Sequence, residues 1–373
     1  MKTLLISVTA GDGHNVTASA IARSLELRGC ETKIADAYRI SGPFFYHLVS
    51  KGYHLASTGL KYGYGAVYRI LEHRPTNSYH LSPARLSGRS LAKKFKRLID
   101  EYDPDVIVVT HPFAARILDI TKERHGFRAA SVAIVTDFTM HPYWEEALRL
   151  DRIVLPSALL LPLALKKGIQ REKLLPLGIP IAAKFDVKTA KEEARRALGL
   201  SPDAPTLLLM KGTLGTGKLH RILHHLDRCS LPWQVIVVCG KSKKAYKKLS
   251  SHTYQKQVRI LSYTEDIPRL MDAADLLITK PGGLTVSEAL TRALPMIIVN
   301  PIPGQEDRNT EFLVAEGVAV KATRKLPVSL AASRIWEENR LCAMRACAEK
   351  LAKPNASDSL CELLFSLGGD DAK

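Results

Sequence analysis

The sequence predicts an α/β protein of two doubly wound domains, and three observations lead to this prediction. Apolar strand patterns alternate with helical patterns nearly throughout the 373 residues, which is typical of parallel sheets covered by helices on both faces. The alternation restarts after a break at "PLGIPIAAKF", residues 176–185. A chain of this length with 46% apolar residues can also form two cores. We expect an N-terminal domain over 1–180 and a C-terminal domain over 181–373, facing each other across a cleft, with the last helix packing back on the first domain.

The elements of the two domains follow in order. The first domain is expected to hold strands at 3–9, 32–36, 105–110, 130–136 and 152–155. The second is expected to hold strands at 206–210, 234–239, 275–279 and 296–299. A helix over Val16–Arg28 has apolar residues at helical spacing and is ended by Gly29. Ligands of such sheets bind where the carboxyl ends of the strands meet the cleft.

The stretch 44–72 departs from this plan. It holds seven of the chain's aromatic residues, mixed with Gly, His, Lys and Arg. Tyrosine beside lysine suits a membrane interface, where the ring is buried and its tip stays wet. A helical insertion packed on the first sheet is the alternative. The neighbouring basic stretch, Arg85–Arg97, favours the membrane, so we expect a membrane-associating region over 44–97.

The formal charge of +17 allows several kinds of partner. Arg85–Arg97 contains six basic residues and no acid, and Lys241–Arg259 contains seven and no acid. Such stretches attract nucleic acid or anionic lipid headgroups, or form a solvated surface without a special partner. None of the common nucleic-acid-binding motifs is present, so no nucleic-acid partner is expected.

The chain is expected to be cytoplasmic and without a transmembrane helix. Its longest apolar run, Ile153–Leu165, is interrupted by Pro156 and Pro162 and is too short to span a bilayer. The start, "MKTLLISVTAGDGH", meets Asp12 and His14 where a signal peptide would have a cleavage site, so it is interpreted as a strand. The six cysteines form no C-x-x-C pair, which indicates neither a zinc site nor a disulfide framework.

Three glycine loops follow predicted strands, and the first, "TAGDGHNVTA" at 9–18, carries His14. Val16 stands where a dinucleotide-binding fingerprint has its third glycine, which disfavours an NAD enzyme. His14 is expected at the mouth of the cleft, where an imidazole can act as a general base. A lone loop histidine is more often a structural hydrogen-bonding residue, and that alternative stays open.

The second loop, "KGTLGTGK", resembles the phosphate loop of an ATPase in its G-x-x-x-x-G-K spacing from Gly212 to Lys218. The residue that should follow and hold Mg²⁺ is Leu219, which makes ATP hydrolysis a poor interpretation. The strand, the glycines and the helix start still predict a cradle for a phosphate group.

The third loop, within 279–309, offers both a helix start and polar side chains. Gly282 and Gly283 follow a strand, and the amides and dipole of the helix that starts near Leu284 suit a diphosphate. Glu288, one turn later, can accept hydrogen bonds from a ribose diol, although Glu is also favoured near a helix start. "PIPGQEDRN" then brings three side chains suited to sugar hydroxyls, namely Gln305, Glu306 and Asn309.

Together these segments resemble a known family. "ITKPGGLTVSEAL…LPMIIVNPIPGQE..N", "GDGHNVTASAIARSL" and "VTDFTMHPYW" (135–144) are similar to the monogalactosyldiacylglycerol synthase and processive diacylglycerol glucosyltransferase group of glycosyltransferase family 28. The resemblance covers nearly the whole chain, and 279–309 is its most specific part. It implies a GT-B fold of two Rossmann-like domains, a UDP-sugar donor, a lipid acceptor and inversion at the anomeric carbon.

The resemblance also assigns roles to matching residues. It implies that Glu288 contacts the ribose of the donor. The diphosphate would be contacted by Gly282, Gly283, Leu284 and Thr285, and the sugar by Gln305, Glu306 and Asn309. The backbone near Ile267 would contact uracil. Gly212 and Thr213 match the phosphate-facing loop, where relatives are often richer in glycine. His14 would be the base or an acceptor-positioning residue. Asp137, the second catalytic candidate, matches the acceptor-side segment together with His141 and Trp144.

The sequence thus predicts an inverting UDP-sugar:diacylglycerol hexosyltransferase on the inner face of the cell membrane. No cofactor or metal is expected, because "DPD" at 103–105 is an ordinary turn signal before a strand. Two alternatives are an enzyme with a polyprenyl-diphosphate acceptor and a catalytically idle UDP-sugar sensor. The sensor would keep Glu288 and Gln305 but would not need His14 or Asp137.

Overall fold

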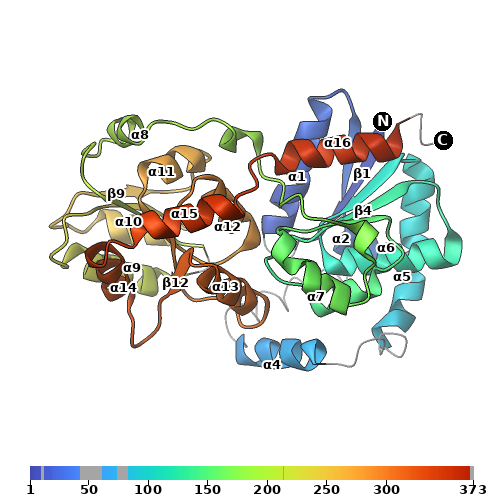
Figure 1. Cartoon of the computed structure of the whole chain (residues 1–373), viewed down its shortest axis with the longest axis horizontal. Coiled ribbons are helices and arrows are strands. Elements are labelled where there is room, and N and C mark those ends of the chain that lie inside the picture. The colour runs from blue at the N-terminus through green and yellow to red at the C-terminus, as the bar shows by residue number, and fades with distance from the viewer. Residues whose placement is uncertain (10–11, 43–60, 74–82, 213, 370–373) are drawn as a thin grey trace. The chain divides into compact units, whose positions relative to one another are not determined.

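The computed structural model describes residues 1–9, 12–42, 61–73, 83–212 and 214–369 (Figure 1). The chain divides into two compact units. The first comprises Met1–Ala183, Pro303–Gln305 and Lys353–Lys373. The second comprises Lys184–Ile302 and Glu306–Ala352. Both ends of the chain therefore belong to the first unit.

The first unit is built on a six-stranded parallel sheet with the order β2-β1-β3-β4-β5-β6. Its strands are β1 (Lys2–Ser7), β2 (Glu31–Asp36), β3 (Val106–Val109), β4 (Ala130–Ile134), β5 (Arg152–Val154) and β6 (Leu174–Leu175). Its helices are α1 (Asp12–Glu26), α2 (Ala37–Ser41), α4 (Lys61–Glu72), α5 (Pro83–Tyr102), α6 (Pro112–His125), α7 (Leu161–Lys166) and α16 (Ala356–Gly368). Shorter turns of helix are η2 (Pro142–Glu146), η3 (Ala158–Leu160) and η4 (Arg171–Lys173), and η5 (Ala183–Phe185) follows at the boundary.

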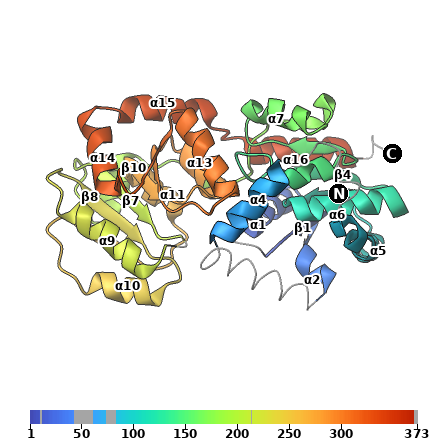
Figure 2. The ribbon, with the colours of Figure 1, turned by 90° about the horizontal axis from the view of Figure 1, so that it is seen from below.

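The last helix completes the core of this unit. Leu360 and Leu364 of α16 are fully buried and pack with Ile21 and Leu25 of α1 in one hydrophobic cluster (Figure 1). Elsewhere in this unit, helix α5 packs along helix α6 (Figure 2). The central strands are apolar and buried on both faces, which is why they were recognisable as continuous apolar runs.

The second unit repeats the plan with the strand order β12-β11-β10-β7-β8-β9, all parallel. Its strands are β7 (Thr206–Met210), β8 (Gln234–Val238), β9 (Val258–Leu261), β10 (Leu276–Thr279), β11 (Met296–Ile298) and β12 (Ala319–Lys321). Its helices are α8 (Lys191–Ala197), α9 (Thr216–Asp227), α10 (Lys243–Ser250), α11 (Ile267–Ala273), α12 (Gly283–Thr291), α13 (Gln305–Ala315), α14 (Val328–Glu337) and α15 (Leu341–Leu351).

The doubly wound class is confirmed, and the differences lie in the details. The helix expected over Val16–Arg28 begins earlier, at Asp12, and ends at Glu26, so Gly13 and His14 belong to its first turn. Three strands were not predicted: β6, β9 and β12. Two of these have two or three residues, and β9 is a partly exposed edge strand containing Arg259, so none gives an apolar run.

The expected membrane-associating region, 44–97, lies partly outside the described residues. Within it the structure describes α4 and part of α5. Tyr68 of α4 is buried against protein, whereas Ile70 is 71% exposed. None of the helices in the described ranges has the length and apolar character needed to cross a membrane.

Each sheet contains one point where the strand order reverses. From β1 the chain continues to β2 on one side, and from β3 it continues to β4 on the other. In the second sheet β7 leads toward β8, and β10 leads toward β11. Loops after such strand pairs diverge and leave a crevice at the carboxyl edge, where ligands of doubly wound folds bind. The two candidate sites are therefore expected after β1 and β3 and after β7 and β10.

Candidate functional site

His14 lies at the reversal point of the first sheet. It belongs to the first turn of α1, and its Nδ1 is 2.8 Å from the carbonyl oxygen of Thr110, the residue after β3. The hydroxyl of Thr136, beyond β4, is 3.0 Å from the same nitrogen. Three loops that are far apart in the sequence thus hold one imidazole ring.

The carbonyl contact fixes the tautomer of His14. A carbonyl oxygen can only accept a hydrogen bond, so Nδ1 of the neutral ring must carry the proton and donate it. Nε2 then keeps its lone pair. Among the described residues no hydrogen bond to Nε2 is recorded, so this nitrogen is able to accept a proton.

Two neighbouring histidines have the opposite tautomer. Nδ1 of His111 accepts the backbone N–H of Phe113 and caps α6, and Nδ1 of His141 accepts the N–H of Tyr143 and caps η2. Each is followed by proline, in the pattern His-Pro. Their Nδ1 atoms are acceptors, so Nε2 carries the proton when the ring is neutral. Of these three rings, His14 alone keeps an unprotonated Nε2.

Burial keeps His14 neutral. It lowers the pKa of His14 to about 4, and the bond to the Thr110 carbonyl opposes this shift. The pKa of His111 is also lowered, first by burial and then by the nearby His14 and His141. The His14 and His111 rings stand edge to face with centroids 4.6 Å apart.

Asp137 and Gln305 meet within the first unit. The Gln305 side-chain amide donates to the Asp137 carboxylate. The two residues before Gln305 rest on α4, since a side chain on Gly304 would collide with Tyr68 and one on Gly65 would collide with Pro303. A residue expected on the donor sugar therefore contacts one expected on the acceptor side.

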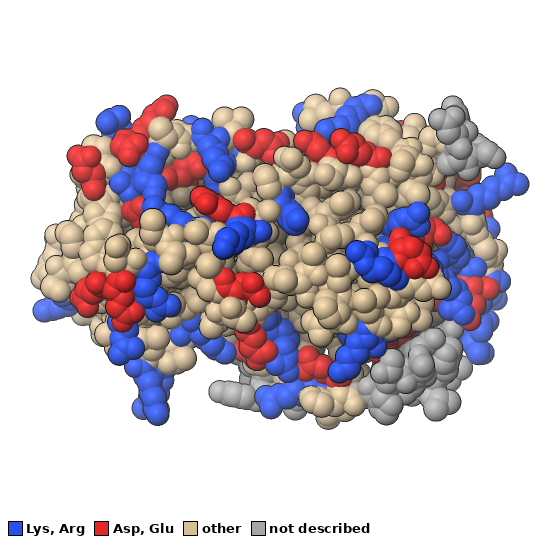
Figure 3. Space-filling view, viewed as in Figure 1, with Lys and Arg blue, Asp and Glu red and all other residues tan. Residues whose placement is uncertain are grey.

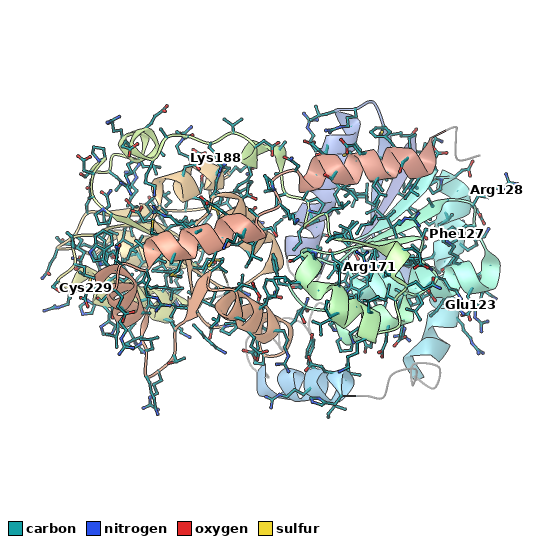
Figure 4. The ribbon with its side chains drawn as sticks, in the orientation of Figure 1. Glu123, Phe127, Arg128, Arg171, Lys188 and Cys229 are labelled. Atoms are coloured by element: carbon teal, nitrogen blue, oxygen red, sulfur yellow. The ribbon has the colours of Figure 1, made fainter. Side chains whose placement is uncertain are left out.

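Helix α6 anchors the acceptor-side segment. Arg116 of α6 forms a buried ion pair with Glu146 of η2, with 2.5 Å between Nε and Oε2. Arg149, just beyond η2, pairs with Asp119 at 3.0 Å and with Glu123 at 2.7 Å; Glu123 is labelled on α6 in Figure 4. Between these anchors Trp144 is only 2% exposed, so its indole supports the segment from inside.

The reversal point of the second sheet brings a lysine to the glycine loop. Lys280 follows β10, and its side-chain carbons would lie 3.5–3.9 Å from a Cβ placed on Gly212, which follows β7. Gly212 has a φ of 47°, a left-handed conformation that favours glycine. The Lys280 ammonium pairs with Glu306 Oε1 at 2.6 Å, and both side chains are mostly buried.

Glu306 and Asn309 brace this crevice. The second carboxylate oxygen of Glu306 accepts the backbone N–H of Ile302 at 2.6 Å. Asn309 is completely buried, and its amide donates to the Pro281 carbonyl at 2.9 Å. Both side chains thus hold the start of α13 against the turn at 280–281, while their expected contacts with the donor sugar stay predictions.

Helix α12 presents its amino end beside Lys280. Gly282 is its N-cap residue, and no side chain caps the first amides, which belong to Gly283, Leu284 and Thr285. A Cβ on Gly282 would meet no described atom within 4 Å, and its backbone conformation is open to any residue. Packing therefore does not require this glycine, whereas close approach of a ligand would.

Glu288 lies one turn further along α12. Burial raises its pKa to about 7, and the positive charge of Lys184 partly opposes the shift. A half-buried carboxyl group with this pKa is typical of a functional position. Ile267, the expected uracil contact, is the first residue of α11, where Asp266 makes no side-chain cap to the free amides.

Sequence reasoning missed three residues of these sites. Thr110 and Thr136 hold His14 from 96 and 122 positions away, a pairing that no local pattern indicates. Lys280 stood in the quoted motif, but only as the end of a strand. Thr213 lies outside the described residues. The "DPD" segment links α5 to β3, and Asp105 accepts the backbone N–H of Lys2 at 2.8 Å.

Comparisons with known proteins agree with the sequence motifs. The profile of monogalactosyldiacylglycerol (MGDG) synthase matches residues 14–181, and that of the glycosyltransferase family 28 C-terminal domain matches residues 206–332. The chain is 26% identical to a processive diacylglycerol beta-glucosyltransferase of Bacillus pumilus, over 97% of this chain and 94% of the relative. It is 28% identical to the Staphylococcus saprophyticus enzyme of that name, over 98% and 93%, respectively. A probable chloroplastic MGDG synthase of Glycine max is 28% identical, over 85% of this chain and 61% of that protein.

Solved structures show the same fold. MurG of Acinetobacter baumannii superposes with a TM-score of 0.65 at 15% identity, over 98% of this chain and 99% of MurG. The calicheamicin glycosyltransferase CalG4 gives 0.66 at 12% identity, over 100% and 99%, respectively. The fold is GT-B, two parallel six-stranded sheets flanked by helices, as the sequence predicted.

Proposed function

Since the chain belongs to glycosyltransferase family 28, in its group of diacylglycerol glycosyltransferases, we propose that it transfers a hexose from a UDP-sugar to diacylglycerol. The product is a membrane glycolipid. The observation that carries the chemical part of the proposal is the tautomer of His14, which leaves Nε2 as a proton acceptor.

The proposed reaction is a single displacement with inversion. The acceptor hydroxyl oxygen bonds to the anomeric carbon while its proton passes to Nε2 of His14. The bond from the anomeric carbon to the diphosphate breaks, and its electron pair leaves on UDP. Asp137 holds the Gln305 amide, which the family pattern assigns to the donor sugar, so this carboxylate couples acceptor-side and donor-side groups.

The charge of the leaving UDP is met by groups of the second unit. The uncapped amides of α12 provide the positive end of a helix, and Lys280 provides an ammonium at the same crevice. These groups supply the neutralisation that the proposed reaction needs, so no metal step is included. Glu306 positions Lys280 through the ion pair, and Glu288 accepts the ribose hydroxyls.

The acceptor is proposed to reach the protein from the cytoplasmic leaflet. On the described part of α5, Arg89 and Lys93 are exposed, and α4 exposes Ile70. Basic and apolar side chains of this kind suit an anionic membrane surface. We place peripheral membrane association in the region 44–97, with His141 and Trp144 in the segment that supports the acceptor.

The test offers labelled donors to the purified protein in the presence of liposomes. The liposomes contain diacylglycerol and anionic lipid, and UDP-glucose, UDP-galactose and UDP-N-acetylglucosamine are supplied in separate reactions. Label in a glycolipid is expected and names the sugar. If UDP binds but no donor labels the lipid, the diacylglycerol proposal is wrong, and a polyprenyl-diphosphate acceptor or a sensor role is tested next.

A further inference from the structure

The second unit carries a basic groove away from its reversal point. The groove lies between α9, the ends of β11 and β12 and the start of α14, and its volume is about 590 Å³. We call it the α9 groove. Figure 3 shows basic side chains on the projecting loop between β12 and α14, at the lower left of the view. The reversal point lies between β7 and β10, whereas this groove borders β11 and β12.

Three cationic side chains and one histidine line the α9 groove, and no carboxylate is among its lining residues. Lys218, Arg221 and His225 come from one face of α9, and Arg324 comes from the loop after β12. Within the described ranges, neither Arg221 nor Arg324 forms an ion pair. The positive charges of Arg221 and Arg324 repel one another, so an anion bound beside them would relieve that repulsion.

The groove accounts for the lysine of the phosphate-loop-like motif. Lys218 stands at the lysine position of the Gly212–Lys218 spacing, but its Nζ donates to Asn300 Oδ1 at 3.0 Å. Asn300 follows β11 and has a φ of 51°, a left-handed conformation that asparagine tolerates better than most residues. The turn therefore directs its amide to Lys218, and the lysine contributes to the α9 groove.

The floor of the α9 groove is apolar. Ile222, Val299 and Val328 line it and are almost buried, at 9%, 2% and 7% exposed. Cationic walls above an apolar floor suit a ligand with both an anionic group and a carbon body. The groove has a volume of about 590 Å³, whereas one water occupies about 30 Å³. A phosphate ion, with five heavy atoms, would therefore fill only part of the groove.

We propose that the α9 groove binds the phosphate group of an organic phosphate, at a site separate from the donor diphosphate. Arg221 and Arg324 bind the phosphate oxygens in charge-assisted hydrogen bonds, and Lys218 adds a point charge. The carbon body rests on the apolar floor. A soluble phosphate ester and the headgroup of an anionic phospholipid share this chemistry.

The test measures binding of defined phosphates to the full chain, with and without saturating UDP. The probes are inorganic phosphate, glycerol 3-phosphate and vesicles of phosphatidylcholine with or without phosphatidylglycerol. The double variant R221Q/R324Q removes two charges from the groove. The matched control K244Q/K247Q removes two charges from exposed positions on α10 of the same unit.

The expected result is binding that persists with UDP and weakens about tenfold or more in R221Q/R324Q but not in the control. Binding of glycerol 3-phosphate supports a soluble ester, and binding only of phosphatidylglycerol vesicles supports a headgroup. Three results would overturn the proposal: loss of binding when UDP is added, equal weakening in both variants, or no binding of any organic probe. If UDP itself fails to bind, the assignment of the donor site is wrong. The comparison of R221Q/R324Q with K244Q/K247Q still tests the proposal for the α9 groove.

Discussion

A single hydrogen bond decides which nitrogen of His14 can accept a proton. The Thr110 carbonyl takes the Nδ1 proton, and burial holds the pKa of the ring near 4, so the ring is neutral at pH 7. His111 and His141 are equally close to the sequence motifs, yet both use Nδ1 as a helix-capping acceptor. The choice among three histidines thus rests on tautomers, which follow from their backbone partners.

Replacing His14 with alanine should abolish transfer and leave the donor site intact. Loss of a general base costs about 10²–10⁴-fold in kcat, and the groups proposed to hold UDP lie in the second unit. Glycolipid formation and UDP affinity are measured on the same preparations of H14A and of H125A, which alters an exposed histidine of α6. If H14A keeps wild-type turnover, another residue must be the base. If H125A loses as much activity as H14A, the loss in H14A is not specific to that residue.

Glu288 should make UDP binding depend on pH near neutrality. The ribose diol donates hydrogen bonds, so it needs the carboxylate form, and burial raises the pKa of this group to about 7. Raising the pH from 6 to 8 increases the carboxylate fraction, and with it the affinity for UDP, by about tenfold. Calorimetric titration checks this. E288Q is expected to bind weakly with no such slope, and a slope that survives in E288Q would point to another group.

At the level of secondary-structure elements, buried ion pairs hold short segments in position. The η2 turn has only five residues and cannot fix itself, so Arg116 of α6 holds it through Glu146. In the same way Glu306 at the start of α13 holds Lys280 at the end of β10. Such pairs fix geometry more than they add stability, because desolvation offsets their attraction.

The substitution E146Q should destabilise the first unit strongly. It removes the carboxylate that pairs with the buried Arg116 guanidinium, and breaking such a buried pair costs about 3–5 kcal/mol in the free energy of unfolding. Urea unfolding is followed by Trp144 fluorescence in a background where Trp233 and Trp336, both of the second unit, are phenylalanine.

The matched control for E146Q is E123Q, which breaks the more exposed pair with Arg149. Exposed pairs contribute at most about 1 kcal/mol, so its unfolding midpoint should move little. Comparable losses in the two variants would mean that burial of the Arg116 pair has no special cost.

Most elements were predictable to the degree that they are buried, although β2, a largely exposed edge strand, was also predicted. Central strands such as β3 and β8 are buried along their whole length and gave clear apolar runs. The edge strands β9 and β12 have polar or exposed positions and gave none. The site followed the same logic: glycines and His14 stood out locally, whereas Thr110, Thr136 and the Lys280 pair depend on contacts between distant segments.

Considered as a whole, the molecule has a less uniform basic surface than its charge of +17 suggests. On α5, Lys96 pairs with Asp100 and Arg97 with Glu101, one helical turn later. The stretch Arg85–Arg97 contains no acidic residue, but the acidic residues that pair with Lys96 and Arg97 follow directly after it. Its pull on an anionic surface therefore rests on residues such as Arg89 and Lys93, which form no ion pair within the described chain.

Removing residues 353–373 should unfold the first unit and spare the second. The deletion uncovers the face of α1 against which Leu360 and Leu364 pack, and each fully buried leucine contributes about 1.5–3 kcal/mol. Circular dichroism should show lost structure, while calorimetry should still detect UDP. Removal of residues 370–373 alone keeps α16 and should leave both readouts unchanged. A deletion protein with wild-type melting would show that α16 is dispensable.

The path of the chain between the units also limits how such proteins can recombine. The chain leaves the first unit after Ala183 and returns for good at Lys353, with Pro303–Gln305 as a brief return between them. A single crossover between two related genes at residue 183 would therefore give each N-terminal unit a foreign final helix. Because Pro303–Gln305 also belongs to the first unit, exchange of an intact unit requires four crossovers, whereas a simple two-part layout would require one.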